Sequence, residues 1–291
     1  MAMMPNFTAL SREQWSWNKK HLSLSLSPHD LSRIQGVNEK LSFQEVREIY
    51  LPVLTSLMPY HMDKQPFIIG ICGSVAVGKT TTARLIKILL ERLFFDKKIS
   101  YLSTDSFLQP LSILKSKQML HRKGFPESYQ WSNLLNFLEQ IKAKKPHVRT
   151  PIYSHEQYDI LHDQFQCFDQ PDILIIEGLN ILQQTPNATT HIQDYLDFSI
   201  FIDAHPERIK QWYIDRFLYF KQHIFINPSN YFHSYADLST EAAIRTATEI
   251  WDEVNGLNLT QHILPTRAHA DLILSKGADH FVHQIIFRDK P

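Results

Sequence analysis

The residues whose types and spacing point most directly to chemistry lie at 73–80, where the chain reads GSVAVGKT. This segment fits the pattern G-x-x-x-x-G-K-[ST], a loop whose successive backbone N–H groups cradle the phosphates of a nucleotide. In that pattern Lys79 reaches the β- and γ-phosphates and the Thr80 hydroxyl binds Mg²⁺. The residues expected to contact ATP are Gly73, Ser74, Val75, Ala76, Val77, Gly78, Lys79, Thr80 and Thr81. Because kinases, GTPases and motors share this loop, it leaves the acceptor of the phosphoryl group open.

Two acidic residues lie at the ends of apolar segments that are typical of strands. Asp105 follows ISYLST (99–104), and Glu177 lies near the end of DILIIEG (172–178). Ligands of open α/β sheets bind at the carboxyl ends of the parallel strands, so both acids are expected near the phosphates. We expect Asp105 to take the proton of an incoming hydroxyl and Glu177 to orient Mg²⁺. The alternative for either residue is a solvated loop acid or a helix cap.

Composition and charge exclude several classes of function. Lys+Arg and Asp+Glu both number 30, so the chain lacks the basic field that nucleic-acid binding requires. The 2 cysteines form no CxxC pattern, which argues against a disulfide framework and a zinc site. No signal peptide and no apolar stretch of about 18 residues is found, and a guanine-reading N-K-x-D motif is missing. We therefore expect a cytoplasmic protein without nucleic-acid or membrane partners that acts on a small molecule.

The segment at 212–235 is unusually aromatic, with nine aromatic side chains in 24 residues against 12% for the chain. Tyr213, Phe217 and Phe220 recur at helical spacing, and Arg216 lies between them. One interpretation is a core-facing stripe with Arg216 extending to solvent. The other is a cleft in which Arg216 meets a phosphate or another anionic group. The wall of such a cleft would be extended by Phe225, Tyr231, Phe232 and Tyr235.

Apolar periodicity predicts the elements that must position these residues. Buried strands are expected at 66–72, 99–104, 172–178, 197–204 and 270–275, and a strand-like segment at 150–159. Helices are expected after the phosphate loop and at 41–57, capped by Ser42, 132–143, 206–222 and 240–255. This alternation predicts an α/β fold, a mainly parallel sheet with helices on both faces, as in P-loop kinases. We expect one domain over 1–291, with a helical N-terminal segment at 1–60 and a helical acceptor-binding or lid region at 206–256.

Several strings of the sequence together resemble one enzyme family. They are GSVAVGKTTTARLIKILL, KGFPESY, PIYSHEQYD, PDILIIEGLN, QWYIDRF, YFHSYADL and LNLTQHILPTRAHADLIL. In this order and approximate spacing the chain resembles the bacterial type I pantothenate kinases, from about Trp15 to about Phe287. The resemblance implies transfer of the γ-phosphoryl group of ATP to pantothenate with Mg²⁺, the first committed step of coenzyme A synthesis. It also implies feedback inhibition by coenzyme A and a homodimer.

The resemblance assigns roles to individual residues. It implies that Lys79 and Thr80 serve ATP and Mg²⁺ and that Asp105 is the catalytic base, so Lys79, Asp105 and Arg216 are the catalytic candidates. Positions that contact pantothenate, phosphates or coenzyme A match Tyr153, His155, Tyr213, Arg216 and Asn255. The aromatic pocket around the acyl chain and thiol matches Phe217, Phe220, Phe225, Tyr231 and Tyr235. The resemblance also places Arg84 among the residues that bind ATP. Arg84 and His155 match positions implicated in inhibition by coenzyme A, and the match strengthens His155, otherwise one of 15 histidines.

The chain departs from the family at three positions. The family's loop reads close to D-G-F-L-[HY]-P-N, whereas this chain has Ser106 after the base and Gln109 in place of the imidazole or phenol. Gly256 stands where the family has a bulky aromatic residue. Two alternatives therefore remain: a related kinase, like uridine kinase or phosphoribulokinase, and a catalytically silent sensor of nucleotide or coenzyme A.

Overall fold

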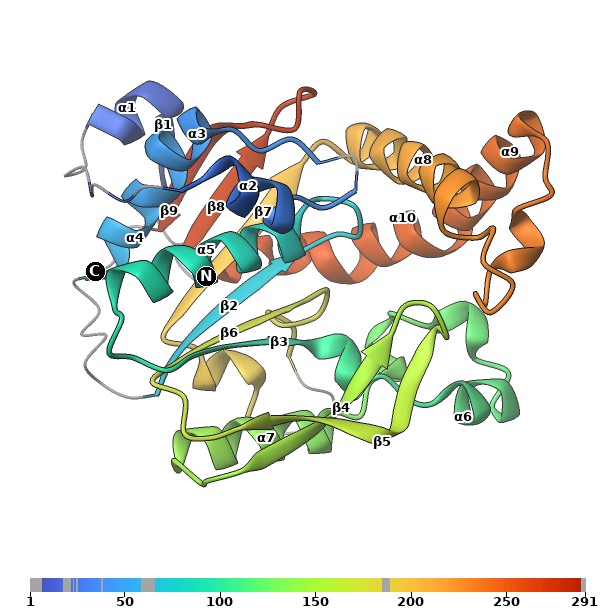
Figure 1. Cartoon of the computed structure of the whole chain (residues 1–291), viewed down its shortest axis with the longest axis horizontal. Coiled ribbons are helices and arrows are strands. Elements are labelled where there is room, and N and C mark those ends of the chain that lie inside the picture. Colours follow the sequence, from blue (N-terminus) through green and yellow to red (C-terminus); the bar gives the residue numbers. More distant parts are fainter. Residues whose placement is uncertain are drawn as a thin grey trace, which may run out of the picture.

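The computed structural model describes residues 7–17, 22, 24, 26–37, 39–58, 66–184 and 189–288. At its centre lies a seven-stranded sheet in the order β1-β9-β8-β7-β2-β6-β3 (Figure 1). A separate two-stranded ribbon pairs β4 with β5. The strands are β1 (Phe7–Ser11), β2 (Phe67–Gly73), β3 (Ile99–Ser103), β4 (Val148–Ser154), β5 (Asp159–Phe168), β6 (Ile173–Gly178), β7 (Phe198–Ala204), β8 (Leu272–Lys276) and β9 (Val282–Arg288).

The sheet is mainly parallel, which confirms the predicted fold class. The strands from β8 to β3 all run parallel, whereas β9 pairs antiparallel with β8 and with β1. The prediction of a helical segment at 1–60 is wrong over Phe7–Ser11, which forms β1. This edge strand has no buried residue, so no apolar run marks it in the sequence. Within 1–60, residues 1–6, 18–21, 23, 25, 38, 59 and 60 lie outside the described residues.

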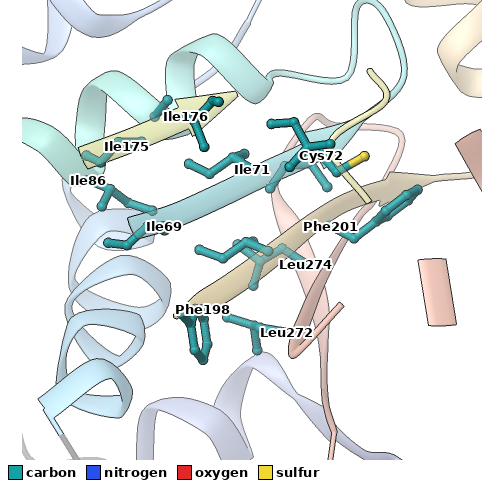
Figure 2. Close-up of a cluster of buried hydrophobic side chains, with 14 of the residues drawn as sticks. Ile69, Ile71, Cys72, Ile86, Ile175, Ile176, Phe198, Phe201, Leu272 and Leu274 are labelled. Carbon is teal, nitrogen blue, oxygen red and sulfur yellow. The ribbon is translucent and has the colours of Figure 1, made fainter. Parts of the chain in front are cut away.

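Strand β2 lies inside the sheet because its residues are apolar on both faces. All seven residues of FIIGICG are buried, with β6 on one side and β7 on the other. Figure 2 shows Ile69 and Ile71 of β2 beside Ile175 and Ile176 of β6, with Ile86 of the following helix close by. A continuous apolar run is what a strand covered on both faces requires. This packing fixes the point at which the loop 73–80 leaves the sheet.

The helices follow the predicted periodicity closely. The cap is confirmed, because the Ser42 hydroxyl accepts from the Glu45 N–H at 3.0 Å. Among the described residues, no helix is both long enough and apolar enough to cross a membrane. The helices are α1 (Arg12–Trp17), α2 (Pro28–Ile34), α3 (Phe43–Glu45), α4 (Leu51–Leu57), α5 (Lys79–Leu93), α6 (Leu111–Ser116), α7 (Trp131–Lys142), α8 (Pro206–His223), α9 (Thr240–Ile250) and α10 (Gly256–Asn258). Two π-helical segments, Trp251–Asn255 and Leu259–Ile263, flank α10.

Helices α8 and α9 pack on each other and project from the sheet, beyond the end of β2 (Figure 1). Their apolar side chains form a small cluster apart from the main core, which we call the arm cluster. Its buried members are Phe217, Phe225, Ala243 and Ala247. Tyr213 packs against both the arm cluster and the main core. The arm therefore has hydrophobic support of its own and meets the sheet at this tyrosine.

Candidate active site

The phosphate loop connects β2 to α5 at the carboxyl end of the parallel strands. Gly78 has φ +99°, a left-handed conformation that favours glycine, and helix α5 begins at the next residue, Lys79. The first N–H groups of α5 have no partner within the helix and are available to an anion. Lys79 Nζ donates to the Ser74 carbonyl at 2.7 Å. The loop thus presents a cation, backbone donors and a helix terminus together.

Other parts of the loop face neighbouring segments. The Thr81 hydroxyl is buried and accepts from the Gly36 N–H at 3.0 Å, so this side chain faces the N-terminal segment. A Cβ placed at Gly78 would lie 2.5 Å from Nζ of Lys276, the buried last residue of β8. Lys276 is a cation beside the loop that the sequence analysis missed, since the two residues lie far apart in the chain.

Thr80 and Glu177 meet, as their positions on α5 and β6 require. The Thr80 hydroxyl donates to Glu177 Oε1 at 3.0 Å, and the Tyr101 hydroxyl donates to the same oxygen at 3.0 Å. Burial, reinforced by the Glu177 carboxylate, raises the pKa of Tyr101, which therefore remains a donor. A hydroxyl that gives its proton to a carboxylate keeps its lone pairs for a cation. Thr80 and Glu177 therefore fit the donor set of a Mg²⁺ ion held beside nucleotide phosphates.

The described residues contain no group of three or more His, Cys, Asp or Glu side chains that could hold a metal ion. A Mg²⁺ ion bound through one or two protein oxygens, phosphate oxygens and water needs no such group. Thr80 and Glu177 therefore suffice as the protein ligands of such an ion.

Asp105 lies in a short 3₁₀ turn, Thr104–Phe107, that follows β3. The turn is tied to the segment around 126–131, because the Gln109 N–H donates to the Ser128 carbonyl at 2.8 Å and the Gln130 N–H donates to the Phe107 carbonyl at 2.7 Å. A Cβ at Gly178 would lie 1.8 Å from Thr104 Oγ1, so glycine there lets the turn approach β6. These contacts bring Asp105 beside Glu177.

The electrostatics of Asp105 reflect this approach. Burial raises the pKa of its carboxyl group, and the Glu177 carboxylate raises it further. The side chains of His155, Lys79 and Lys123 oppose this shift. The structure thus brings together three of the predicted residues, Asp105, Glu177 and Lys79, with His155 nearby. A carboxylate with an elevated pKa is a stronger base than an ordinary aspartate.

Lys123 is a second cation that the sequence analysis missed. It is buried, donates to the Tyr158 carbonyl, and lies 3.5 Å from the ring centroid of Tyr158 and 5.0 Å from that of Tyr153. Burial lowers the pKa of Lys123 to about 8, although the carboxylates of Asp159 and Asp105 oppose the shift. The only sign of Lys123 in the sequence is its place at the start of KGFPESY, a string that carries no recognisable catalytic pattern.

The residue after Lys123 is held from two distant parts of the chain. The Gly124 carbonyl accepts from the side-chain amides of Asn180 and Asn258, each at 3.0 Å. Gln183 donates to the Asn180 side chain at 2.9 Å and to the His262 carbonyl at 2.8 Å. The loop that carries Lys123 is thereby fixed to the segment following β6 and to the end of α10.

The predicted aromatic wall forms a set of rings in mutual contact. The ring centroids of Phe217 lie 5.5 Å from Phe225 and 5.4 Å from Tyr235, and those of Phe220 and Phe225 are 5.9 Å apart. Phe217 and Phe225 are buried, which favours the core-stripe interpretation for these two rings. Tyr231 is more open, with 38% of its surface exposed. Contact of these rings with a substrate stays a prediction.

Tyr213, Arg216 and Asn255 come together at the base of the arm. Burial raises the pKa of Tyr213 to about 12, while the adjacent Arg216 and the Asn255 side chain lower it. Burial also lowers the pKa of Arg216, whereas Tyr213 and the Glu39 carboxylate oppose this shift; among the described residues Arg216 forms no ion pair with a carboxylate. A guanidinium of this kind is well suited to an anionic ligand. Arg84, the other predicted arginine, is exposed on α5.

Tyr158, in the turn between β4 and β5, contacts rings of the arm. Its ring lies 5.1 Å from that of Tyr231 and 4.8 Å from that of Phe232. Burial raises its pKa, and the hydroxyls of Tyr213 and Tyr231 and the carboxylate of Asp105 raise it further. Tyr153 and His155 contact each other nearby, with ring centroids 5.1 Å apart. The turn between β4 and β5 therefore lies between Asp105 and the arm.

The three departures from the family have visible structural settings. Ser106 is buried in the 3₁₀ turn, and its φ is not positive, so a serine at this position imposes no backbone strain. Gln109 donates to the Glu127 carbonyl at 3.1 Å and accepts from Lys117 at 3.3 Å. A Cβ at Gly256 would lie 2.9 Å from Nε1 of Trp251, whose ring is 5.7 Å from that of Tyr213. Glycine thus gives Trp251 room beside the base of the arm.

Comparison with known proteins gives consistent results. A family model described as the phosphoribulokinase/uridine kinase family matches residues 68–216. The chain is 48% identical to the pantothenate kinase of Pasteurella multocida, covering 97% of this chain and 95% of that protein. The pantothenate kinase of Haemophilus influenzae is 47% identical, with 97% of each chain covered. The D-glycerate 3-kinase of Cryptococcus neoformans is similar in fold alone, with a TM-score of 0.51 and 14% identity over 75% of this chain and 88% of that chain.

Proposed function

Because the chain belongs to the phosphoribulokinase/uridine kinase family and, within it, to the pantothenate kinases, we propose that it phosphorylates pantothenate. The γ-phosphoryl group of ATP would pass to the primary hydroxyl and give 4′-phosphopantothenate, the first committed step of coenzyme A synthesis. The observation that carries this proposal is the placement of a basic carboxylate, Asp105, beside Lys79 and Glu177. Phosphoryl transfer depends mainly on such positioning and charge neutralisation.

Each group has a role that its surroundings support. The loop 73–80 binds the phosphates, Lys79 neutralises the charge that develops on them, and Asp105 accepts the proton of the attacking hydroxyl. Thr80 and Glu177 would hold Mg²⁺, which when bound neutralises phosphate charge and orients the phosphates. The cations of Lys79 and Lys123 favour the ionised form of Asp105, which is the form that acts as a base.

The acceptor would occupy the space bordered by the β4–β5 turn and the arm. Tyr153, Tyr213 and Asn255 offer polar groups to the amides of pantothenate, and Arg216 offers a cation to its carboxylate or to phosphate. The rings of the arm cluster would pack against Tyr213 and hold it in place. Tyr231, the more open ring, would contact the acyl chain directly.

A coupled assay of ADP release, with pantothenate, uridine and ribulose 5-phosphate as separate acceptors, tests the proposal. We expect turnover with pantothenate and only background hydrolysis with the other two. Preference for uridine or ribulose 5-phosphate would assign the chain to a different member of the family. Tight nucleotide binding without acceptor-dependent turnover would mean that the protein is a sensor.

The value of kcat/KM should depend on the charge of Lys123. Since the pKa of Lys123 is lowered to about 8, its positive charge is lost as the pH rises through that value. We therefore expect kcat/KM for pantothenate to fall above pH about 8 and Lys123→Met to abolish this alkaline limb. At pH 7 the kcat/KM of this variant should be about tenfold lower than that of the wild type, in the range expected for loss of one charge-assisted contact.

The control for this pH profile is Lys145→Met, which changes an exposed lysine outside the site. It should keep the wild-type profile. An unchanged alkaline limb in Lys123→Met would contradict the role given to Lys123.

Regulation and assembly complete the proposal. Coenzyme A would inhibit by competing with ATP, through Arg84 and His155, and the protein would be a homodimer. Inhibition kinetics at varied ATP concentration test this competition, and Arg84→Ala should weaken inhibition by coenzyme A more than it raises the KM for ATP.

Analytical ultracentrifugation tests the proposed homodimer, and a monomeric mass at micromolar concentration would contradict it.

A further inference from the structure

Tyr101 is a residue to which neither the phosphate-loop pattern nor the family resemblance gives a role. It lies on β3, parallel to β6, and its hydroxyl donates to Glu177 Oε1 at 3.0 Å. Its own carbonyl accepts from the Gln166 side chain of β5 at 2.8 Å. Tyr101 is therefore held on both sides, by the sheet register and by the ribbon.

The hydrogen bonds at Glu177 are distributed unequally between its two oxygens. Oε1 accepts from both Thr80 and Tyr101, each at 3.0 Å. A carboxylate oxygen has two lone-pair sites, so these two donors saturate Oε1. The rotation of the carboxylate group is then fixed, and Oε2 is the oxygen left for another ligand.

We propose that Tyr101 is a positioning residue that fixes the Glu177 carboxylate, with Oε1 serving Thr80 and Oε2 turned toward Mg²⁺ or one of its waters. This inference rests on the proposed function, because it requires a Mg²⁺–nucleotide complex at the loop 73–80. Groups that orient a metal ligand without touching the metal commonly change metal affinity by about 10- to 100-fold. Without Tyr101, only the Thr80 hydroxyl would restrain Oε1.

The variant Tyr101→Phe tests this role, because it removes the hydroxyl and keeps the ring. We expect the Mg²⁺ concentration for half-maximal activity to rise about tenfold, with kcat at saturating Mg²⁺ within about twofold of the wild type. Binding measurements give a readout independent of catalysis. By calorimetry, ADP binding should weaken about tenfold in the presence of Mg²⁺ at a fixed subsaturating concentration and stay unchanged in EDTA.

The matched control is Tyr195→Phe, which removes a hydroxyl from another half-buried tyrosine, at the end of the 3₁₀ turn Ile192–Tyr195. It should leave Mg²⁺ half-saturation, ADP binding and the melting temperature unchanged. Wild-type Mg²⁺ dependence in Tyr101→Phe would overturn the proposal. A lower melting temperature with reduced kcat at saturating Mg²⁺ and unchanged half-saturation would overturn it too, because that result describes a purely structural tyrosine.

Failure of this inference can be distinguished from failure of the proposed function. If the wild-type protein does not phosphorylate pantothenate, the function is wrong, yet the Mg²⁺-dependent binding of ADP still reports on Tyr101. If the wild type phosphorylates pantothenate and both measurements on Tyr101→Phe match it, the function stands and the role of Tyr101 does not.

Discussion

Replacing Asp105 with asparagine is expected to lower kcat for pantothenate phosphorylation by about 10³-fold. The amide keeps the shape of the side chain but cannot accept the proton of the attacking hydroxyl. Because Asp105 lies outside the loop 73–80 that binds the phosphates, the dissociation constant of Mg²⁺–ATP should change by less than about threefold, or 0.7 kcal/mol. Steady-state turnover and calorimetric binding of ATP together check both statements.

Two comparisons make the Asp105 result specific. Background hydrolysis of ATP without an acceptor should persist in the variant, because that reaction uses no acceptor hydroxyl. Asp163→Asn, a change of an exposed aspartate on β5, should behave like the wild type in every assay. Turnover retained in Asp105→Asn would remove this residue from the role of base.

Replacing Lys79 with methionine is expected to reduce kcat by about 10²- to 10³-fold, whichever acceptor is used. The Nζ atom of Lys79 donates to the Ser74 carbonyl of its own loop, and we expect it to reach phosphates bound there. Its charge acts on the phosphoryl group itself, so background ATP hydrolysis should fall along with pantothenate phosphorylation. The ratio of these two rates distinguishes Lys79→Met from Asp105→Asn.

Lys87→Met is the control on the same helix. Lys87 forms an ion pair with Glu91 one turn further along α5, toward the end of the helix that lies away from the phosphate loop. Its loss should leave both rates unchanged and alter stability only slightly, as expected of an exposed pair. If Lys79→Met retained more than a tenth of wild-type turnover, Lys79 would not be the main cation in the transition state.

The parts of the site that the sequence predicted are those in which function is encoded locally. The phosphate loop is contiguous, and its strand and helix have apolar patterns of the correct period on either side. Asp105 and Glu177 were predictable because the carboxyl ends of parallel strands meet at one edge of the sheet. The confirmed parallel order places β6 beside β2 and β3 beside β6, so the three carboxyl ends lie at the same edge of the sheet.

The parts that the sequence did not predict depend on contacts between distant segments. Lys123 acquires its lowered pKa through burial and its position through two asparagines, one of them 134 residues away from Gly124. Tyr101 reads as an ordinary strand residue until Glu177, 76 residues later, is placed beside it. The edge strand β1 was missed because its pairing with β9 joins the two ends of the chain.

The separation of the arm cluster from the main core affects how acceptor specificity can evolve. Substitutions among the rings of α8 and of the segment between α8 and α9 can be accommodated within the arm cluster, so they need not disturb the strands that carry the phosphate loop. A new acceptor can thus be selected without rebuilding the nucleotide half of the enzyme. Tyr213 limits this freedom, because it packs against both clusters and each must tolerate any change there. Divergence of substrate preference should therefore be frequent in the arm and rare at its junction with the sheet.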